Sequence, residues 1–357
     1  MQNKLNVAVV FGGKSGEHEV SLMSATNVIN AMDKDKYNIY TIGITKQGKW
    51  MLYKGSVEKL QDGSWEQEAS MLNSGELIEL LLSPMLGENQ KGQIDAIFPV
   101  LHGPNGEDGT IQGFFEMLDI PYVGCGVIGS SLGMDKAISK QLFIDAGLNV
   151  ADYILTYKHE IKDNLQGVIS KIERKFKYPV FVKPVNMGSS VGITKAHDRT
   201  ELESGLQEAV KHDRKILIEE FIKGSEIECA VLGNNYPEAS GAGEIIPSKE
   251  FYDYEAKYFD DGKSTLIIPA RLTEEEESSI REAAVRAFKA LDCCGMSRVD
   301  FFLDRSTGKV YINEINTIPG FTKISMYPKL WEKAGLGYSK LIDKLIELAI
   351  ERHIETK

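Results

Sequence analysis

The sequence is poor in cysteine, in long apolar segments and in net positive charge. Its 357 residues include four cysteines, Cys125, Cys229, Cys293 and Cys294, whose spacing fits neither a zinc site nor a disulfide framework. No apolar stretch is long enough to span a membrane, and the N-terminus has no apolar region followed by a small-residue cleavage site. We therefore expect a cytoplasmic protein with reduced thiols.

The formal net charge of -11 argues against general affinity for nucleic acid or for anionic membranes. Lysines that stand in loops are then better suited to small anions. A chain of this length should divide into two or three domains with ample apolar interior.

The first hundred residues predict a parallel α/β sheet. An apolar run at 6–11 ends in Gly12-Gly13, and an amphipathic pattern at 20–32 and a second apolar run at 39–44 follow. The order of strand, glycine turn, helix and strand is typical of such sheets. A later apolar run ends in the polar, glycine-rich loop 102–109, and open sheets bind ligands at the carboxyl ends of their strands.

The second half predicts a smaller α+β region and then a hairpin. Strands at 178–183 and 216–221 frame a helix at 201–212. Further on, strand-like runs at 296–303 and 310–316 flank a turn. We expect that turn to hold three residues with Gly308 in the left-handed position, which places Arg305 opposite Lys309.

The expected register places Asp300 opposite Glu314 and Arg298 opposite Asn316, and alternation puts all four side chains on one face. Two carboxylates facing each other repel unless something neutralises them. Carboxylate and amide oxygens suit Mg²⁺, whose shell is usually completed by phosphate and water. The hairpin thus predicts a metal and phosphate platform, with a solvated strand face as the alternative.

Several loops carry related signals. The loop 186–192 contains glycine and two serines and fits either an ordinary hairpin turn or a loop whose N–H groups close over phosphates. Lys183 favours phosphate, because its apolar strand would otherwise leave the ammonium half-buried and unpaired. Carboxylates and an aromatic at 219–226 suit an adenine and ribose pocket, and a solvated strand end equally well. The segment 249–258 is aromatic and charged without a period, which fits either a lid or a surface crossover.

The chain resembles the D-alanine:D-alanine ligases of the ATP-grasp superfamily from end to end. The motifs that carry the resemblance are FGGKSGEHEVSL (11–22), LHGPNGEDGTIQG (101–113), MDK (134–136), VKP (182–184), GSSVG (188–192), YDYEAKY (252–258), SRVD (297–300) and NEINTIPGFT (313–322). The resemblance implies a three-domain fold of α/β and α+β type. It consists of an N-terminal parallel-sheet domain at 1–124, a central ATP-grasp subdomain at 125–219, and a C-terminal ATP-grasp subdomain at 220–357.

The resemblance also implies roles at the amino-acid subsites. Glu17 corresponds to the acid that holds the ammonium of the first D-alanine, with His102 and Ser189 beside it. Ser325 and Met326 line the subsite of the second amino acid. Dimerisation through the N-terminal domain is implied as well.

For the nucleotide, the resemblance implies ATP and two Mg²⁺ ions, with Mn²⁺ as an alternative; the residues do not indicate whether K⁺ activates. Asp300, Glu314 and Asn316 match the metal ligands, and Arg298 and the Gly320 N–H match the oxyanion site. Lys136, Lys183 and Ser190 match residues that bind phosphate. Glu219 matches the residue that binds the adenine amino group, Glu220, Phe221 and Ile222 match those that line the adenine, and Glu226 matches the ribose ligand. In the lid, Lys257 corresponds to the residue that reaches the γ-phosphate, and Tyr258 to the one that contacts Glu17 and Ser189.

The implied reaction joins two D-alanines through a D-alanyl phosphate for peptidoglycan precursor synthesis. Tyr258 and Met326 favour D-alanine in both subsites, whereas the N-terminal stretch and 42–50 also resemble the D-serine-using branch, so D-alanine:D-serine ligation is the alternative. The sequence lacks the Gly-x-Gly-x-x-Gly turn of NAD-dependent dehydrogenases, which argues against that class. A non-catalytic nucleotide-binding protein would not need the hairpin residues together with Lys257. An ATP-grasp ligase with other substrates would share the hairpin but not the Glu17 and His102 loops.

Overall fold

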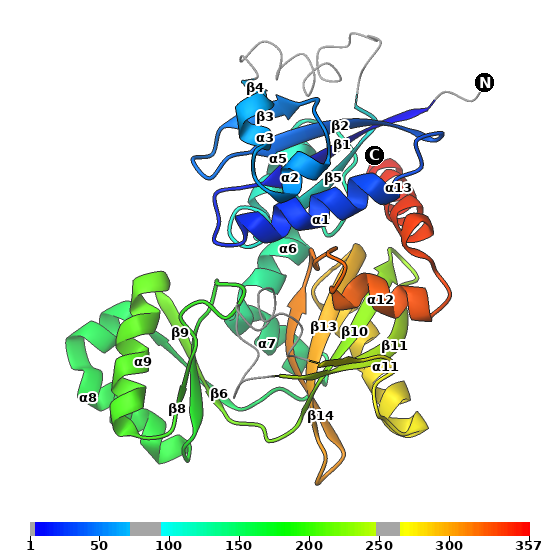
Figure 1. Cartoon of the computed structure of the whole chain (residues 1–357). Helices are drawn as coiled ribbons and strands as arrows, with labels where there is room; N and C mark the ends of the chain where they lie inside the picture. Colours follow the sequence, from blue (N-terminus) through cyan, green and yellow to red (C-terminus); the bar gives the residue numbers. More distant parts are fainter. Residues whose placement is uncertain (1–3, 72–93, 248–264) are drawn as a thin grey trace.

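The computed structural model describes residues 4–71, 94–247 and 265–357, which form three β-sheets with flanking helices (Figure 1). The N-terminal sheet has the strand order β4-β3-β2-β1-β5. Its strands are β1 (Leu5–Gly12), β2 (Tyr37–Ile44), β3 (Trp50–Tyr53), β4 (Ser70–Met71) and β5 (Ala96–Leu101), and its helices are α1 (His18–Ala31), α2 (Glu58–Gln61), α3 (Trp65–Glu68) and α5 (Thr110–Met117). The strands β2, β1 and β5 are parallel, as predicted, and β3 and β4 add an antiparallel edge.

A buried tryptophan closes one face of this sheet. The Trp65 ring packs edge-on against Phe11, with ring centroids 5.1 Å apart, and lies over Gly43 of β2. A Cβ added at Gly43 would stand 2.2 Å from the Trp65 ring. The glycine is therefore required by the close approach of the indole.

The central sheet has the order β6-β9-β7-β8 and is antiparallel. Its strands are β6 (Tyr153–Tyr157), β7 (Val180–Pro184), β8 (Thr194–Ala196) and β9 (Lys215–Glu220), and its helices are α8 (Lys158–Lys175) and α9 (Arg199–His212). The predicted pair of strands around a helix is confirmed. The loop 186–192 connects β7 to β8, so it does close a hairpin.

The C-terminal sheet has the order β12-β11-β10-β13-β14. Its strands are β10 (Ser225–Gly233), β11 (Glu238–Ile246), β12 (Thr265–Ile267), β13 (Gly295–Asp304) and β14 (Lys309–Asn316), and the remaining helices are α6 (Val127–Met134), α7 (Lys136–Asp145), α11 (Glu274–Ala290), α12 (Met326–Lys333) and α13 (Tyr338–Glu355). Helices α6 and α7 lie against β14, where they bring the start of the central region beside the hairpin.

The turn of the β13–β14 hairpin differs from the prediction. Asp304 rather than Arg305 pairs with Lys309, so the loop holds four residues, 305–308, with Gly308 left-handed at φ 69°. The Asp304 carboxylate accepts hydrogen bonds from the Ser306 N–H and hydroxyl, 2.8 and 2.6 Å away. These bonds start the turn one residue early, as aspartate commonly does.

The register at the base of the hairpin is nevertheless the predicted one. A bulge leaves Asn313 without a partner on β13, so that Asp300 faces Glu314 and Arg298 faces Asn316. One extra residue on a strand shifts the pairing by one, and this compensates for the longer turn.

The N-terminal sheet and the C-terminal helices share one apolar core. Val9 and Phe98 of the sheet belong to the same buried cluster as Met296, Tyr327 and Leu341. Figure 1 shows α13, at the C-terminal end of the chain, beside α1. This shared core fixes the N-terminal loops relative to the hairpin, while the domain boundaries at 124 and 219 stay a prediction.

Among the residues of known placement, no helix is long and apolar enough to cross a bilayer.

Candidate active site

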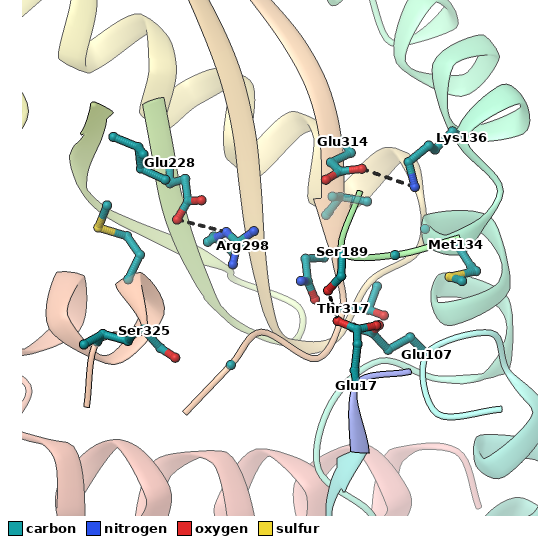
Figure 2. Close-up of a pocket in the computed structure, with 18 of the residues that line it drawn as sticks. Glu17, Glu107, Met134, Lys136, Ser189, Glu228, Arg298, Glu314, Thr317 and Ser325 are labelled. Carbon is teal, nitrogen blue, oxygen red and sulfur yellow. Dashed lines mark hydrogen bonds and ion pairs between the residues drawn. The ribbon is translucent and has the colours of Figure 1, made fainter. Parts of the chain in front are cut away.

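Residues from all three sheets line one cleft (Figure 2). The N-terminal sheet contributes the start of α1, the central sheet contributes the β7–β8 loop, and the C-terminal sheet contributes the hairpin and the segment after it. The cleft gathers these predicted site residues: Glu17, Lys136, Ser189, Arg298, Glu314, Asn316, Gly320, Ser325 and Met326. An adjoining cavity is lined by Lys136, Lys183, Ser189, Ser190, Glu226, Asp300 and Glu314.

Three carboxylates stand in register across neighbouring strands at the centre of the site. Glu228 of β10 faces Asp300 of β13, which in turn faces Glu314 of β14. Arg298 offsets part of this charge: its Nε and second guanidinium nitrogen each lie 2.7 Å from one Asp300 oxygen, and its Nε lies 3.1 Å from Glu228. Glu228 was not predicted, although it alternates with Glu226 on one face of its strand.

The hairpin suits a hard divalent cation that is also held by phosphate. Among the residues of known placement, no cluster of three or more acidic, histidine or cysteine side chains forms a ready metal cage. Asp300 and Glu314 face each other beside the Asn316 amide, and one or two carboxylates completed by substrate phosphates are the usual way in which proteins hold Mg²⁺. The oxygen donors present therefore fit Mg²⁺.

Glu17 lies where the N-terminal sheet meets the central loop. It precedes α1, and its carboxylate accepts a hydrogen bond from the Ser189 hydroxyl. The Glu17 N–H donates to Ser15 Oγ over 3.2 Å, and Ser15 donates to the carbonyl of His102 over 2.8 Å. The His102 ring is buried, with Nδ1 3.1 Å from the Ile318 carbonyl. The structure thus brings Glu17, Ser189 and His102 together, as predicted.

Glu107 is a second carboxyl group in this corner, and sequence reasoning missed it. Its carboxylate accepts the Gly103 N–H over 2.7 Å, and it lines the cleft with Glu17 (Figure 2). Burial, together with the negative charge of Glu17, raises the pKa of Glu107 to about 8. Glu107 therefore keeps its proton to a higher pH than an exposed glutamate would.

The two predicted phosphate lysines reach the site from different elements. Lys136, at the first position of α7, donates to the Met187 carbonyl over 2.8 Å and lies 3.3 Å from Glu314. Lys183 of β7 contacts Asn313 over 3.2 Å, so the bulged residue also faces the second cavity. Ser189 and Ser190 have left-handed φ values of 49° and 60°, and both serines line the second cavity together with the two lysines.

Glu219 lies behind the second cavity rather than in it. Its oxygens lie 2.7 Å from Lys140 Nζ and 2.6 Å from Lys183 Nζ. Burial favours the neutral acid, but the Lys140 and Lys183 charges outweigh it and lower the pKa of Glu219 to about 2. The prediction did not include Lys140, although it lies one helical turn after Lys136.

The predicted adenosine residues follow one after another along the chain. Glu220 ends β9, and its carboxylate accepts the Asp152 N–H over 2.9 Å. Phe221 and Ile222 lie in the connection to β10, where the Phe221 ring is 6.2 Å from the Phe181 ring. Of the predicted adenosine residues Glu220, Phe221, Ile222 and Glu226, only Glu226 lines the second cavity, and Phe181 lines it too.

Gly320, Ser325 and Met326 line another part of the cleft. Ser325 Oγ accepts the Thr322 N–H over 2.9 Å, and a Cβ added at Gly320 would stand 2.8 Å from that oxygen. Met326 begins α12 and packs its sulfur against Gly243 of β11, where an added Cβ would be 2.5 Å away. A glycine at 320 keeps this part of the cleft open.

The predicted lid at 249–258, with Lys257 and Tyr258, lies outside the described residues.

Residues 6–125 match the family model of the D-ala D-ala ligase N-terminus, and residues 142–347 match that of the D-ala D-ala ligase C-terminus. A D-alanine–D-alanine ligase of Thermoanaerobacter sp. is 57% identical, with 99% of this chain and 98% of the relative covered. One of Clostridium novyi is 52% identical, with coverages of 98% and 99%.

Solved structures agree in fold. The D-alanine-D-alanine ligase of Coxiella burnetii superposes with a TM-score of 0.85 at 38% identity, covering 99% of this chain and 96% of that one. The VanG D-Ala:D-Ser ligase of Enterococcus faecalis superposes with a TM-score of 0.84 at 40% identity, covering 97% of this chain and 100% of that one.

Proposed function

Since the chain belongs to the D-alanine–D-alanine ligase family, we propose that it joins two D-alanines to D-alanyl-D-alanine while converting ATP to ADP and phosphate. The product serves peptidoglycan precursor synthesis, and the fold is the ATP-grasp fold of that family. The observation that carries the proposal is the single cleft in which Glu17, Lys136 and the acidic hairpin all take part. Such a cleft can hold an amino acid and a triphosphate side by side.

The first step activates a carboxylate, which is otherwise a poor electrophile. A carboxylate oxygen of the first D-alanine attacks the γ-phosphorus of ATP, the bond to the bridging oxygen of ADP breaks, and D-alanyl phosphate forms. Glu17 holds the ammonium of this D-alanine. Lys136 and Lys183 hold the phosphates, because a fixed ammonium offsets charge that would otherwise keep the two anions apart.

Asp300, Glu314 and Asn316 would hold two Mg²⁺ ions on the hairpin together with ATP phosphate oxygens. Bound there, the ions offset the negative charge between the triphosphate and the carboxylate. Mn²⁺ would meet the same oxygen donors.

The second step forms the peptide bond. The neutral amine of the second D-alanine attacks the acyl carbon, a tetrahedral oxyanion forms, and phosphate leaves as the carbonyl is restored. Arg298 and the Gly320 N–H stabilise that oxyanion, since fixed donors aimed at developing charge lower the barrier. Ser325 and Met326 shape the acceptor subsite, and the buried Met326 favours a methyl side chain over a hydroxymethyl one.

D-alanine:D-serine ligation is the second candidate, and the likeness to the VanG ligase favours it. A competition assay with equal D-alanine and D-serine, with the dipeptides separated by mass, distinguishes the two. Predominance of D-alanyl-D-alanine supports the first candidate, and predominance of the mixed dipeptide supports the second.

We also propose that the protein is a homodimer. Exposed apolar side chains stand on the two adjoining helices α5 and α6: Phe114 and Met117 on α5, and Val127 and Ile128 on α6, with Met117 75% and Ile128 60% exposed. Met117→Asp should shift the mass measured by light scattering from dimer to monomer. Tyr236→Ser, at another exposed site, is the control and should leave the dimer intact.

The reaction is assigned to the cytoplasm, where ATP is available. All four cysteines are free thiols, which suits a reducing compartment.

A further inference from the structure

Lys140 is a buried lysine beside the nucleotide site that no step of the mechanism uses. It lies on α7 four residues after Lys136, so both side chains leave the same face of the helix. Its side chain is 1% exposed, and Nζ lies 2.7 Å from one oxygen of Glu219. Lys183 Nζ lies 2.6 Å from the other oxygen.

The three side chains form a buried group with one more positive charge than negative. Burial lowers the pKa of Lys140, and Glu219 opposes that shift. For Lys183, burial likewise acts to lower the pKa, but Glu219 together with Glu314 and Glu226 outweighs it, and the pKa is raised. Glu219 therefore stabilises both ammonium groups. Removing either lysine would leave the negative charge of the buried Glu219 carboxylate less well neutralised.

The two lysines differ in what they can reach. Lys183 lines the second cavity, next to Glu226 and Asp300. Lys140 lines neither that cavity nor the cleft. A triphosphate in the site can thus draw Lys183 toward itself but cannot reach Lys140.

We propose that Lys140 is a positioning residue of the nucleotide site: it holds Glu219 from behind, so that Lys183 can turn to the ATP phosphates while Glu219 stays ionised and fixed beside the adenine. This inference rests on the proposed function, in which Lys183 binds phosphate and Glu219 binds the adenine amino group. Without Lys140, the departure of Lys183 would leave the buried Glu219 carboxylate without its two lysine partners, and breaking a buried ion pair in this way is strongly unfavourable. Lys183 would then stay on Glu219, and ATP would bind weakly.

A purely structural role for Lys140 predicts something else. The ion pair between Lys140 and Glu219 would then only hold α7 against β9. Lys215 of β9 already does this through its buried ion pair with Asp135, the N-cap residue of α7. Lys215→Met is consequently a matched control: it breaks a buried ion pair between the same two elements, and Lys215 lines neither cavity.

The test compares steady-state kinetics of Lys140→Met, Lys140→Arg and Lys215→Met. We expect Lys140→Met to raise KM for ATP about ten- to a hundredfold, the effect of losing a charge-assisted contact, and to leave KM for D-alanine within about twofold. Lys140→Arg should restore most of the affinity for ATP, and Lys215→Met should lower Tm without raising KM for ATP. If Lys140→Met and Lys215→Met change KM for ATP equally, the proposal is wrong.

Two further measurements keep the test decisive. If Lys140→Met does not fold, Lys140→Gln keeps a donor to Glu219 without the charge and should show the same rise in KM; an unchanged KM overturns the proposal. Equilibrium titration with ADP needs no turnover. If the wild-type protein released no phosphate with D-alanine, the proposed function would fail, whereas weaker ADP binding by Lys140→Met alone would still support a positioning role.

Discussion

Glu314→Gln is the substitution for which the structure predicts a large effect on activity and a small effect on stability. It keeps the size of the side chain and removes one of the two facing carboxylates of the hairpin. Glu314 lies opposite Asp300 and 3.3 Å from Lys136. Any cation held between β13 and β14 would lose half of its facing negative charge.

The effect on turnover should be large. Charge stabilisation by a bound metal ion amounts to several kcal/mol, and a loss of about 4 kcal/mol corresponds to roughly a thousandfold. We therefore expect kcat for D-alanine-dependent phosphate release to fall by about a thousandfold or more.

The effect on folding should be small. The variant loses the ion pair with Lys136, but the Lys136 ammonium retains its hydrogen bond to the Met187 carbonyl, 2.8 Å away. It also loses the repulsion between facing carboxylates, which typically costs about 0.2 to 1 kcal/mol. These changes oppose each other, so the free energy of unfolding without ligand should stay within about 1 kcal/mol of wild type.

The assay measures phosphate release at saturating ATP, D-alanine and Mg²⁺, with Tm recorded on the same samples. Glu347→Gln is the matched control, because Glu347 is an exposed residue of α13 that pairs loosely with Lys344 over 3.8 Å. A Glu314→Gln protein that turned over within tenfold of wild type would refute the hairpin as the metal site. A large drop in Tm would instead mean that the carboxylate is structural.

Three further predictions follow from other parts of the site and fold. Glu17→Gln should raise KM for the first D-alanine about ten- to a hundredfold and leave KM for ATP unchanged in initial-rate kinetics. The pKa of Glu107 is raised from 4.5 to about 8, so the folded state binds a proton that the unfolded state releases, and the wild-type protein loses stability as pH rises through that window. Glu107→Gln cannot lose this proton. In urea unfolding, the free energy of unfolding of the variant relative to wild type should therefore be about 2 to 4 kcal/mol higher at pH 8.5 than at pH 5. Gly43→Ala should cost about 1 to 3 kcal/mol of unfolding free energy in the same assay, since its Cβ meets the Trp65 ring; an unchanged midpoint would contradict the packing described for that face.

Local patterns in the sequence were sufficient for the hairpin but not for its surroundings. The facing of Asp300 and Glu314 was predicted correctly from an incorrect turn, because the longer loop at 305–308 and the bulge at Asn313 compensate. A bulge leaves no clear mark in a single sequence. The pairing that matters for a metal was therefore right, while the route to it was wrong.

Long-range packing explains what was missed. Glu228 joins the carboxylate row only because β10 pairs with β13, about 70 residues later in the chain, and sequence gives no partner for a strand. Glu107 stands in a polar loop, and its burial depends on the loop's contact with the start of α1. Lys140 was within reach of prediction, since its helical spacing from Lys136 places it on the same face.

The shared core was also beyond local reasoning. The C-terminal helix α13 packs against α1 and β5 at the other end of the chain, so the loops of Glu17 and His102 are held against the hairpin by residues that carry no chemistry. Helical periodicity can indicate a helix such as α13 but not the surface that it covers.

If the first D-alanine becomes an acyl phosphate in this cleft, one of its carboxylate oxygens must leave with the released phosphate, and isotope transfer can detect that oxygen. D-Alanine labelled with ¹⁸O in both carboxylate oxygens is turned over with unlabelled ATP, and the released phosphate is analysed by mass spectrometry. An acyl phosphate intermediate predicts that each phosphate carries one ¹⁸O from the carboxylate and that the new peptide carbonyl retains the other. Unlabelled phosphate, formed in step with dipeptide, would contradict it.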